Sequence, residues 1–171
     1  MKGIIIYKSK YGSTKQYAQW LHEETGFELC NSKDFSKDIS KYDAIVIAAS
    51  IHAGSLSLKR FLLDTWPLIS EKRIAVLVTS GAGHQEVVKQ ILKDSLPQAV
   101  YGKLNIFPVG GRYVLGEMSF IDRTLIRIAA FFTNNPHAKK GMLEEKREVS
   151  RDNLQGIVEF VKAPPNAEGP A

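Results

Sequence analysis

Short, continuous apolar runs alternate along this chain with segments whose apolar residues repeat at helical spacing. Residues 44–49 (Ala-Ile-Val-Ile-Ala-Ala) and residues 74–78 are apolar throughout, as strands are when helices cover both faces of a parallel sheet. Residues 2–7 and 27–30 predict two earlier strands, and residues 104–109 predict a fifth. The fifth contains a proline, which cannot donate a ladder hydrogen bond, and this favours an edge position for it.

The stretches between these runs have the period of amphipathic helices. Ser57 is expected to cap the second helix, and Pro67 is expected to end it. The other helices are expected before Gly26 and over residues 85–94, 119–132 and 146–161.

Alternating strands and helices predict an α/β fold, because parallel neighbours need right-handed helical crossovers. The expected architecture has three layers: a five-stranded parallel sheet in the order 2-1-3-4-5, with helices on both faces. A chain of 171 residues suffices for one such domain. We expect it to span residues 1–163, with residues 164–171 as a disordered tail. Ligands of such sheets bind where the winding reverses, here at the carboxyl ends of the first and third strands.

Cysteine content, apolar runs and net charge limit the cofactors, the location and the partners that are expected for this chain. Cys30 is the only cysteine, so neither an internal disulfide nor a thiolate metal site is expected, and no metal is predicted. No apolar run approaches the roughly 20 residues that span a bilayer, and no signal peptide is recognisable, so a cytoplasmic protein is expected. The net charge of +5 favours an acidic partner or an anionic membrane surface. No nucleic-acid-binding motif accompanies it, so nucleic acid is not expected as a partner.

The loop after the first strand is rich in groups that bind anions. It consists of Ser9, Lys10, Tyr11, Gly12, Ser13 and Thr14. Hydroxyls and backbone N–H groups at the start of a helix can converge on a phosphate, with the helix dipole adding attraction. The glycine patterns of a Rossmann site and of a nucleotide-triphosphate loop are both absent. A hydroxyl-rich helix cap without a ligand is the alternative.

One stretch resembles a known family. The pattern Ile5-Ile6-Tyr7-x-Ser9-x-x-Gly12-x-Thr14-x-x-x-Ala18-x-x-Leu21 is similar to the FMN-phosphate signature of the flavodoxins. The resemblance implies a flavodoxin-like fold with FMN as the cofactor. It also implies that residues 9–14 hold the FMN phosphate.

Two further loops consist mainly of small residues, which lets their backbones approach a flat ring. We expect the isoalloxazine of FMN to bind between them. His52 and His84 are candidates to cover the ring, or else are exposed loop residues; neither is assigned an acid–base role. The predicted ring-binding residues are Ser50, Ile51, His52, Ala53 and Gly54 in the first loop, and Thr79, Ser80, Gly81, Ala82, Gly83 and His84 in the second.

The segment from Ser119 to Phe132 predicts a helix that begins with a capping box between Ser119 and Asp122. An apolar face runs along it, and Arg123 and Arg127 share another face. Two interpretations follow. The segment is a core helix with two solvated arginines, or it contacts a membrane or a hydrophobic substrate.

A second resemblance is narrower. Ala48-Ala49-Ser50-Ile51 to Gly54, Gly110-Gly111-Arg112-Tyr113 and Asp122-Arg123 with Ile126 and Ile128 are similar to the menaquinone-dependent protoporphyrinogen IX dehydrogenase branch. That resemblance implies an FMN-dependent oxidoreductase of heme biosynthesis, with a quinone-type acceptor and peripheral membrane contact through residues 119–132. A flavodoxin that carries single electrons in solution, with a redox-protein partner, is the alternative. A receiver domain is disfavoured, because acidic residues are missing from residues 8–10 and 48–50.

Overall fold

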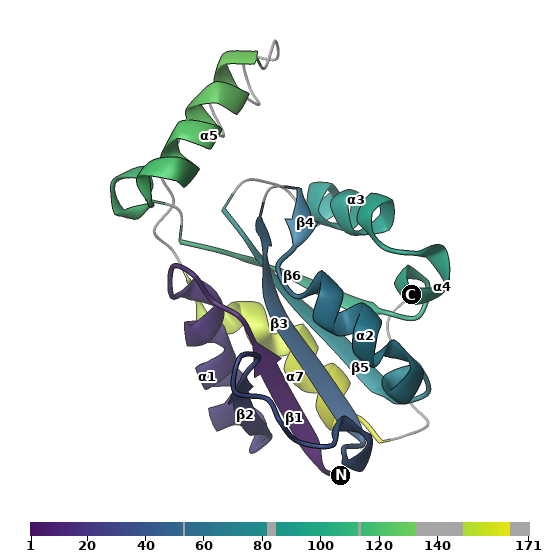
Figure 1. The fold of residues 1–171 in the computed structure, drawn as a ribbon. Helices are drawn as coiled ribbons and strands as arrows, with labels where there is room; N and C mark the ends of the chain where they lie inside the picture. Colours follow the sequence, from purple (N-terminus) through teal and green to yellow (C-terminus); the bar gives the residue numbers. More distant parts are fainter. Residues whose placement is uncertain (53, 82–84, 113, 133–148, 165–171) are drawn as a thin grey trace.

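The computed structural model describes residues 1–52, 54–81, 85–112, 114–132 and 149–164. A parallel sheet crosses the middle of the molecule (Figure 1). Its strand order is β2-β1-β3-β5-β6, which confirms the predicted order 2-1-3-4-5, with Pro108 in an edge strand. The strands are β1 (Gly3–Tyr7), β2 (Glu28–Asn31), β3 (Ala44–His52), β5 (Arg73–Ser80) and β6 (Asn105–Gly110).

A two-residue strand, β4 (Ser55–Leu56), adds to the predicted five. It pairs antiparallel with the end of β3, with His52 opposite Ser55. This hairpin lengthens β3 by three residues beyond the apolar run that predicted it, so residues 50–52 lie in a strand and not in a loop.

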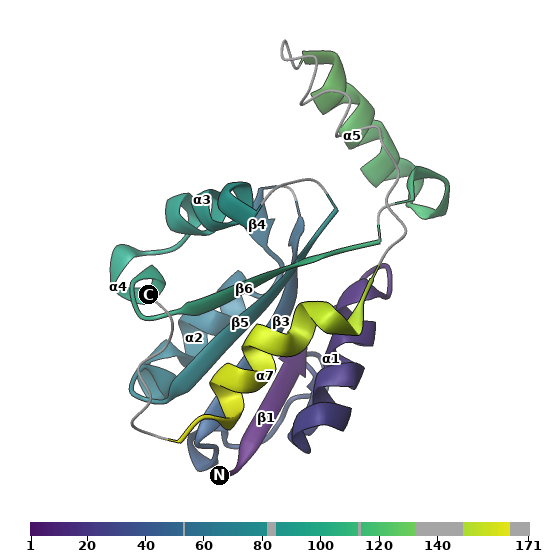
Figure 2. The same cartoon turned by 180° about the vertical axis from the view of Figure 1, so that it is seen from behind.

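Helices cover both faces of the sheet, as predicted. One face carries α1 (Ser13–Thr25) and α7 (Gln155–Lys162), which Figure 2 shows in front of the strands. The other face carries α2 (Lys59–Ile69) and α3 (Gln85–Ser95). The remaining helical elements are α4 (Gln98–Tyr101), α5 (Phe120–Phe132) and the 3-10 turns η1 (Ile39–Lys41), η2 (Leu115–Glu117) and η3 (Arg151–Leu154).

Side chains of β1 alternate between the two cores. Ile4 and Ile6 pack with the α2 and α3 face, whereas Ile5 packs with the α1 and α7 face. All three are fully buried. Because both faces are covered, the strand is apolar at successive positions, which is why the apolar runs predicted the sheet.

Three helix boundaries were wrong. Leu58, not Ser57, is the N-cap of α2, because the Ser57 hydroxyl accepts a hydrogen bond from the Ser50 N–H instead. Pro67 lies inside α2, where the buried Ile69 anchors the last turn although proline cannot donate to that turn. The last helix begins at Gln155 after η3, whose N-cap is Ser150. Residues 146–148 and the predicted tail from 165 lie outside the described residues.

Helix α5 projects away from the layers of the domain (Figures 1 and 2). Six of its large apolar side chains are between 49% and 76% exposed, whereas Ile126 is partly buried. The described structure therefore disagrees with an ordinary core helix. The exposed residues are Phe120, Ile121, Leu125, Ile128, Phe131 and Phe132.

Candidate functional site

The carboxyl ends of β1, β3 and β5 meet at one edge of the sheet. Tyr7 pairs with Ala48, and Ser50 pairs with Thr79, so the segments that follow these strands are neighbours. This arrangement brings residues 9–14, 50–52 and 79–81 to the same end of the molecule. The predicted ring-binding residues Ala53, Ala82, Gly83 and His84 lie outside the described residues.

The loop of residues 9–14 leaves the N-terminus of α1 without a side-chain cap. Gly12 is the N-cap, with a φ of 94° that favours glycine. The Gly12 N–H donates to the Ser9 hydroxyl oxygen at 3.1 Å, and no acidic residue occupies the first turn. The cap that the alternative interpretation requires is therefore missing, and the positive end of the helix dipole faces this loop.

Ser13 connects the loop to the segment after β6. Its hydroxyl oxygen accepts a hydrogen bond from the Arg112 N–H at 2.9 Å. The Gly111 N–H donates to the Ser80 carbonyl at 3.1 Å, and a Cβ at Gly111 would lie 3.3 Å from the Ser80 carbonyl carbon. Residues 110–112 thus approach the site closely. They belong to the stretch that carries the second resemblance, but they were not among the predicted cofactor-binding residues.

Thr14 lies behind the loop and is 2% exposed. Its hydroxyl oxygen is 2.7 Å from that of Thr79, which also lies 3.5 Å from the Ala49 carbonyl. Thr79 has one hydroxyl hydrogen, so Thr14 is free to donate to an anion only when Thr79 donates to Thr14. Thr79, near the end of β5, is itself buried, so its hydroxyl is a hydrogen-bond partner of Thr14.

The remaining predicted residues lie at or beside strand ends, and Gly54 is a turn residue with a φ of 73° directly before β4. Ser50 donates its N–H to the Ser57 hydroxyl at 3.2 Å, and Ile51 packs against the core. The side chain of His52 is half exposed. Ser80 is the last residue of β5, and Gly81 follows it.

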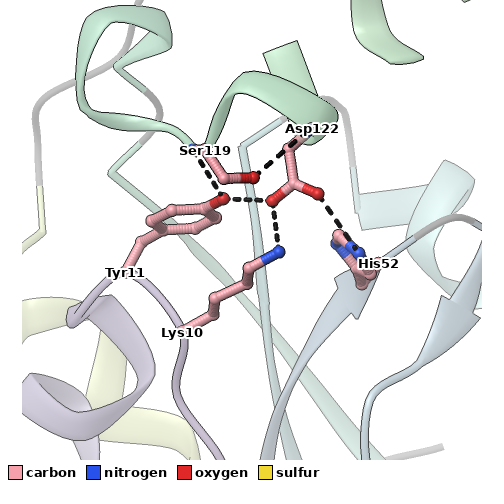
Figure 3. Close-up of polar contacts among 5 residues, drawn as sticks. All are labelled: Lys10, Tyr11, His52, Ser119 and Asp122. Atoms are coloured by element: carbon pink, nitrogen blue, oxygen red, sulfur yellow. Dashed lines mark hydrogen bonds and ion pairs between the residues drawn. The ribbon is translucent and has the colours of Figure 1, made fainter. Parts of the chain in front are cut away.

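The structure adds a residue that sequence reasoning did not place in the site. Asp122 of α5 is buried, and its carboxylate Oδ2 accepts hydrogen bonds from the Lys10 ammonium at 2.5 Å and from the Tyr11 hydroxyl. His52 Nε2 lies 3.7 Å from the other carboxylate oxygen. Figure 3 shows these side chains converging. A separation of 112 positions between Lys10 and Asp122 leaves no short-range signal for this contact.

Half of the predicted capping box forms. The Asp122 N–H donates to the Ser119 hydroxyl at 3.2 Å. The Asp122 carboxylate does not return to the Ser119 N–H, which donates to the Tyr11 hydroxyl at 3.3 Å instead (Figure 3). The capping residue therefore connects α5 to the loop after β1.

The ion pair between Lys10 and Asp122 shifts the pKa of both side chains. Hydrogen bonds from Lys10 and Tyr11 lower the pKa of Asp122, and the hydrogen bond to Asp122 raises the pKa of Lys10. A lowered carboxyl pKa contributes stability above the ordinary aspartate value, and this contribution is lost as the pH falls. A raised lysine pKa contributes stability at pH values below the ordinary lysine pKa, and this contribution is lost as the pH rises through the raised pKa. The pair is therefore intact throughout the neutral range.

We expect the carboxyl carbon of Asp122 to titrate below the ordinary aspartate value of about 3.9. A carbon-detected NMR titration of the protein measures this pKa directly. Replacing Lys10 by Gln should move it upward, because the largest cause of the shift is removed. An inflection at or above the ordinary value in the unmodified protein would show that the ion pair does not form in solution.

The described residues contain neither a candidate metal site nor a membrane-spanning helix. No group of three or more His, Cys, Asp or Glu side chains there is placed to hold a metal ion. Within the same residues, no helix has the length and apolar character needed to cross a membrane.

Comparison with known proteins gives a family. The family model of the flavodoxin domain matches residues 4–140. No curated protein matches the sequence significantly.

Several solved structures are similar to this chain at low identity. A flavoprotein in complex with FMN from Lactobacillus acidophilus NCFM is 20% identical, with 64% of this chain and 91% of that chain covered and a TM-score of 0.48. A flavodoxin from the domain Archaea is 19% identical, with coverages of 75% and 96% and a TM-score of 0.45. The Trp repressor binding protein from Bacillus subtilis is 15% identical, with coverages of 64% and 83% and a TM-score of 0.46. With most of the sequence inside the family match, this chain belongs to the flavodoxin domain family.

Proposed function

We propose that this chain binds FMN and acts as an FMN-dependent oxidoreductase with a quinone-type acceptor. The uncapped N-terminus of α1, with hydroxyls on both sides of Gly12, carries the proposal. The match to the flavodoxin domain supports FMN as the cofactor. Bound FMN supplies the electron-transfer chemistry, and the protein supplies binding, orientation and local electrostatics.

The residues present fit a phosphate group. Backbone N–H groups at the start of α1 would donate to it, and the hydroxyls of Ser9 and Thr14 would be additional donors. Lys10 and Tyr11 lie in the same loop. The flavin ring would lie beside residues 50–54 and 79–84, most of which have small side chains that permit close backbone contact.

Two observations support the proposed quinone acceptor: the exposed helix α5 and the resemblance of the chain to the protoporphyrinogen dehydrogenase branch. A helix with exposed apolar side chains and nearby arginines is suited to the surface of an anionic bilayer, where menaquinone resides. We infer a cytoplasmic protein that contacts the inner face of the membrane through residues 119–132. Protoporphyrinogen IX is the proposed donor.

The test is an anaerobic reaction of the FMN-loaded protein. Protoporphyrinogen IX should reduce the bound flavin, and a soluble menaquinone analogue should reoxidise it faster than a one-electron acceptor of similar potential does. Stopped-flow absorbance of the flavin records both steps. Reoxidation by one-electron acceptors alone, without reaction with the porphyrinogen or the quinone, would assign the chain to the soluble one-electron carriers instead.

A further inference from the structure

Asp122 is a buried carboxylate whose partners belong to the loop proposed to hold a phosphate. Its side chain is 7% exposed, whereas that of Lys10 is 51% exposed. Lys10 and Tyr11 both donate to the same carboxylate oxygen. The ammonium of the loop is therefore already occupied by an anion from α5.

The same contacts hold α5 against the domain. The Ser119 N–H donates to the Tyr11 hydroxyl, and His52 faces the second oxygen of Asp122 (Figure 3). In the part of the chain that the structure describes, the polar contacts found between residues 119–132 and the other elements all belong to this cluster. Since six of the large apolar side chains of α5 are exposed, this cluster is the polar attachment of the helix to the described part of the domain.

A phosphate in residues 9–14 would be a second anion beside Asp122. Flavin phosphate carries more negative charge than a carboxylate and offers more acceptor oxygens, so it competes well for a single ammonium. Two anions close together also repel each other. The side chain of Lys10 is half exposed, and the long four-carbon stem of a lysine lets its ammonium exchange one partner for the other with little rearrangement.

We propose that Asp122 is an internal competitor of the flavin phosphate for Lys10, so that FMN binding releases Asp122 and loosens the start of α5. The inference rests on the proposed function and deepens it, because it makes the attachment of the helix proposed for membrane contact depend on flavin loading. It also makes Asp122 a residue that weakens FMN binding.

Four proteins test the competition: the unmodified chain, Asp122→Asn, Lys10→Gln and the double variant. Asp122→Asn keeps the shape of the side chain and frees Lys10. It should bind FMN about tenfold more tightly, the order expected for one additional charge-assisted hydrogen bond to the phosphate. Lys10→Gln alone should change the FMN dissociation constant little, because Lys10 only exchanges one anion for another. The double variant should lose the tighter binding. Fluorescence quenching of FMN gives all four constants.

Hydrogen exchange of the backbone amides of α5 is the second measurement. Saturating FMN should speed exchange in residues 120–132 of the unmodified chain, whereas saturating riboflavin, which has no phosphate, should not. In Asp122→Asn these amides should exchange fast with or without FMN. The amides of β1 and β3 report whether each variant is folded, and Asp94→Asn on the exposed surface of α3 is the matched control.

The outcomes separate the two hypotheses. If the chain binds FMN but Asp122→Asn binds it equally or more weakly, the competition is wrong and the proposed function stands. Slower exchange of α5 on FMN binding would also overturn the competition. If only Asp122→Asn binds FMN measurably, the competition is supported in its strongest form. Failure of all four proteins to bind FMN would overturn both hypotheses.

Discussion

FMN should bind this chain about a hundredfold more tightly than riboflavin, because one or two hydrogen bonds to a charged group, worth about 1.5–3 kcal/mol each, distinguish the two ligands. The donors are the N–H groups at the uncapped start of α1 and the hydroxyls around Gly12. Calorimetric titration of the apo-protein with each flavin measures the ratio. FAD should bind more weakly than FMN, since its flavin phosphate is joined to AMP through a pyrophosphate bond and is no longer a terminal dianion.

Thr14→Ala separates binding from structure in the same experiment. If the Thr14 hydroxyl donates to the phosphate, the variant should lose about tenfold in FMN affinity, the lower end of one charge-assisted bond, and keep its riboflavin affinity. Thr65→Ala removes a similar hydroxyl from α2, where it donates to the Phe61 carbonyl, and is the matched control. An unchanged FMN-to-riboflavin ratio, with a stability loss of about 1 kcal/mol, would make Thr14 a structural partner of Thr79. Equal binding of FMN and riboflavin by the unmodified chain would mean that residues 9–14 do not bind phosphate.

The sheet could be predicted because its strands are buried on both faces. Ile4, Ile5 and Ile6 are all fully buried but face two different cores, and only a parallel sheet between helices requires apolar residues at successive positions. The end of β3 could not be predicted this way, because a hairpin with β4 extends it past the apolar run. The prediction that Pro67 ends α2 was wrong because a tertiary contact again outweighs the local signal. Burial of Ile69 holds the last turn of α2 where local propensity favours its end.

The site divides in the same manner. The loop of residues 9–14 is local, so its hydroxyls, its glycine and the following helix are visible in six consecutive positions. The contact of Lys10 with Asp122 depends on the direction in which α5 leaves the domain. The spacing of apolar residues in the sequence does not predict that direction. The sequence predicted that the Asp122 carboxylate caps α5. In the structure this carboxylate binds Lys10 of the loop, and only the Asp122 N–H takes part in the cap. Local chemistry was predictable here, whereas the charge balance of the site required the tertiary structure.

The second large effect concerns α5 and membranes. Anionic vesicles should recruit the protein at low salt, because exposed phenylalanines of α5 can insert while Arg123 and Arg127 attract headgroups. Each basic residue near such a surface contributes about 1 kcal/mol, so Arg123→Glu with Arg127→Glu should lower vesicle partitioning by at least about thirtyfold. Co-sedimentation with vesicles of anionic and of neutral lipid measures this, and added salt should weaken the binding to anionic lipid alone.

The charge of the whole protein is the competing explanation, since the chain is basic throughout. Arg60→Glu with Lys93→Glu changes the net charge by the same amount but on α2 and α3, where both side chains are exposed. Only the α5 pair should abolish recruitment if the helix is the contact. Equal losses from both pairs would mean that the net charge attracts the protein to the vesicles without a defined face.

Phe131→Ser with Phe132→Ser tests the apolar contribution of α5 to vesicle binding. This double variant leaves every charge in place and should still release the protein from the vesicles. If the unmodified chain ignores anionic vesicles at low salt, α5 is not a membrane contact and the quinone assignment loses its structural support.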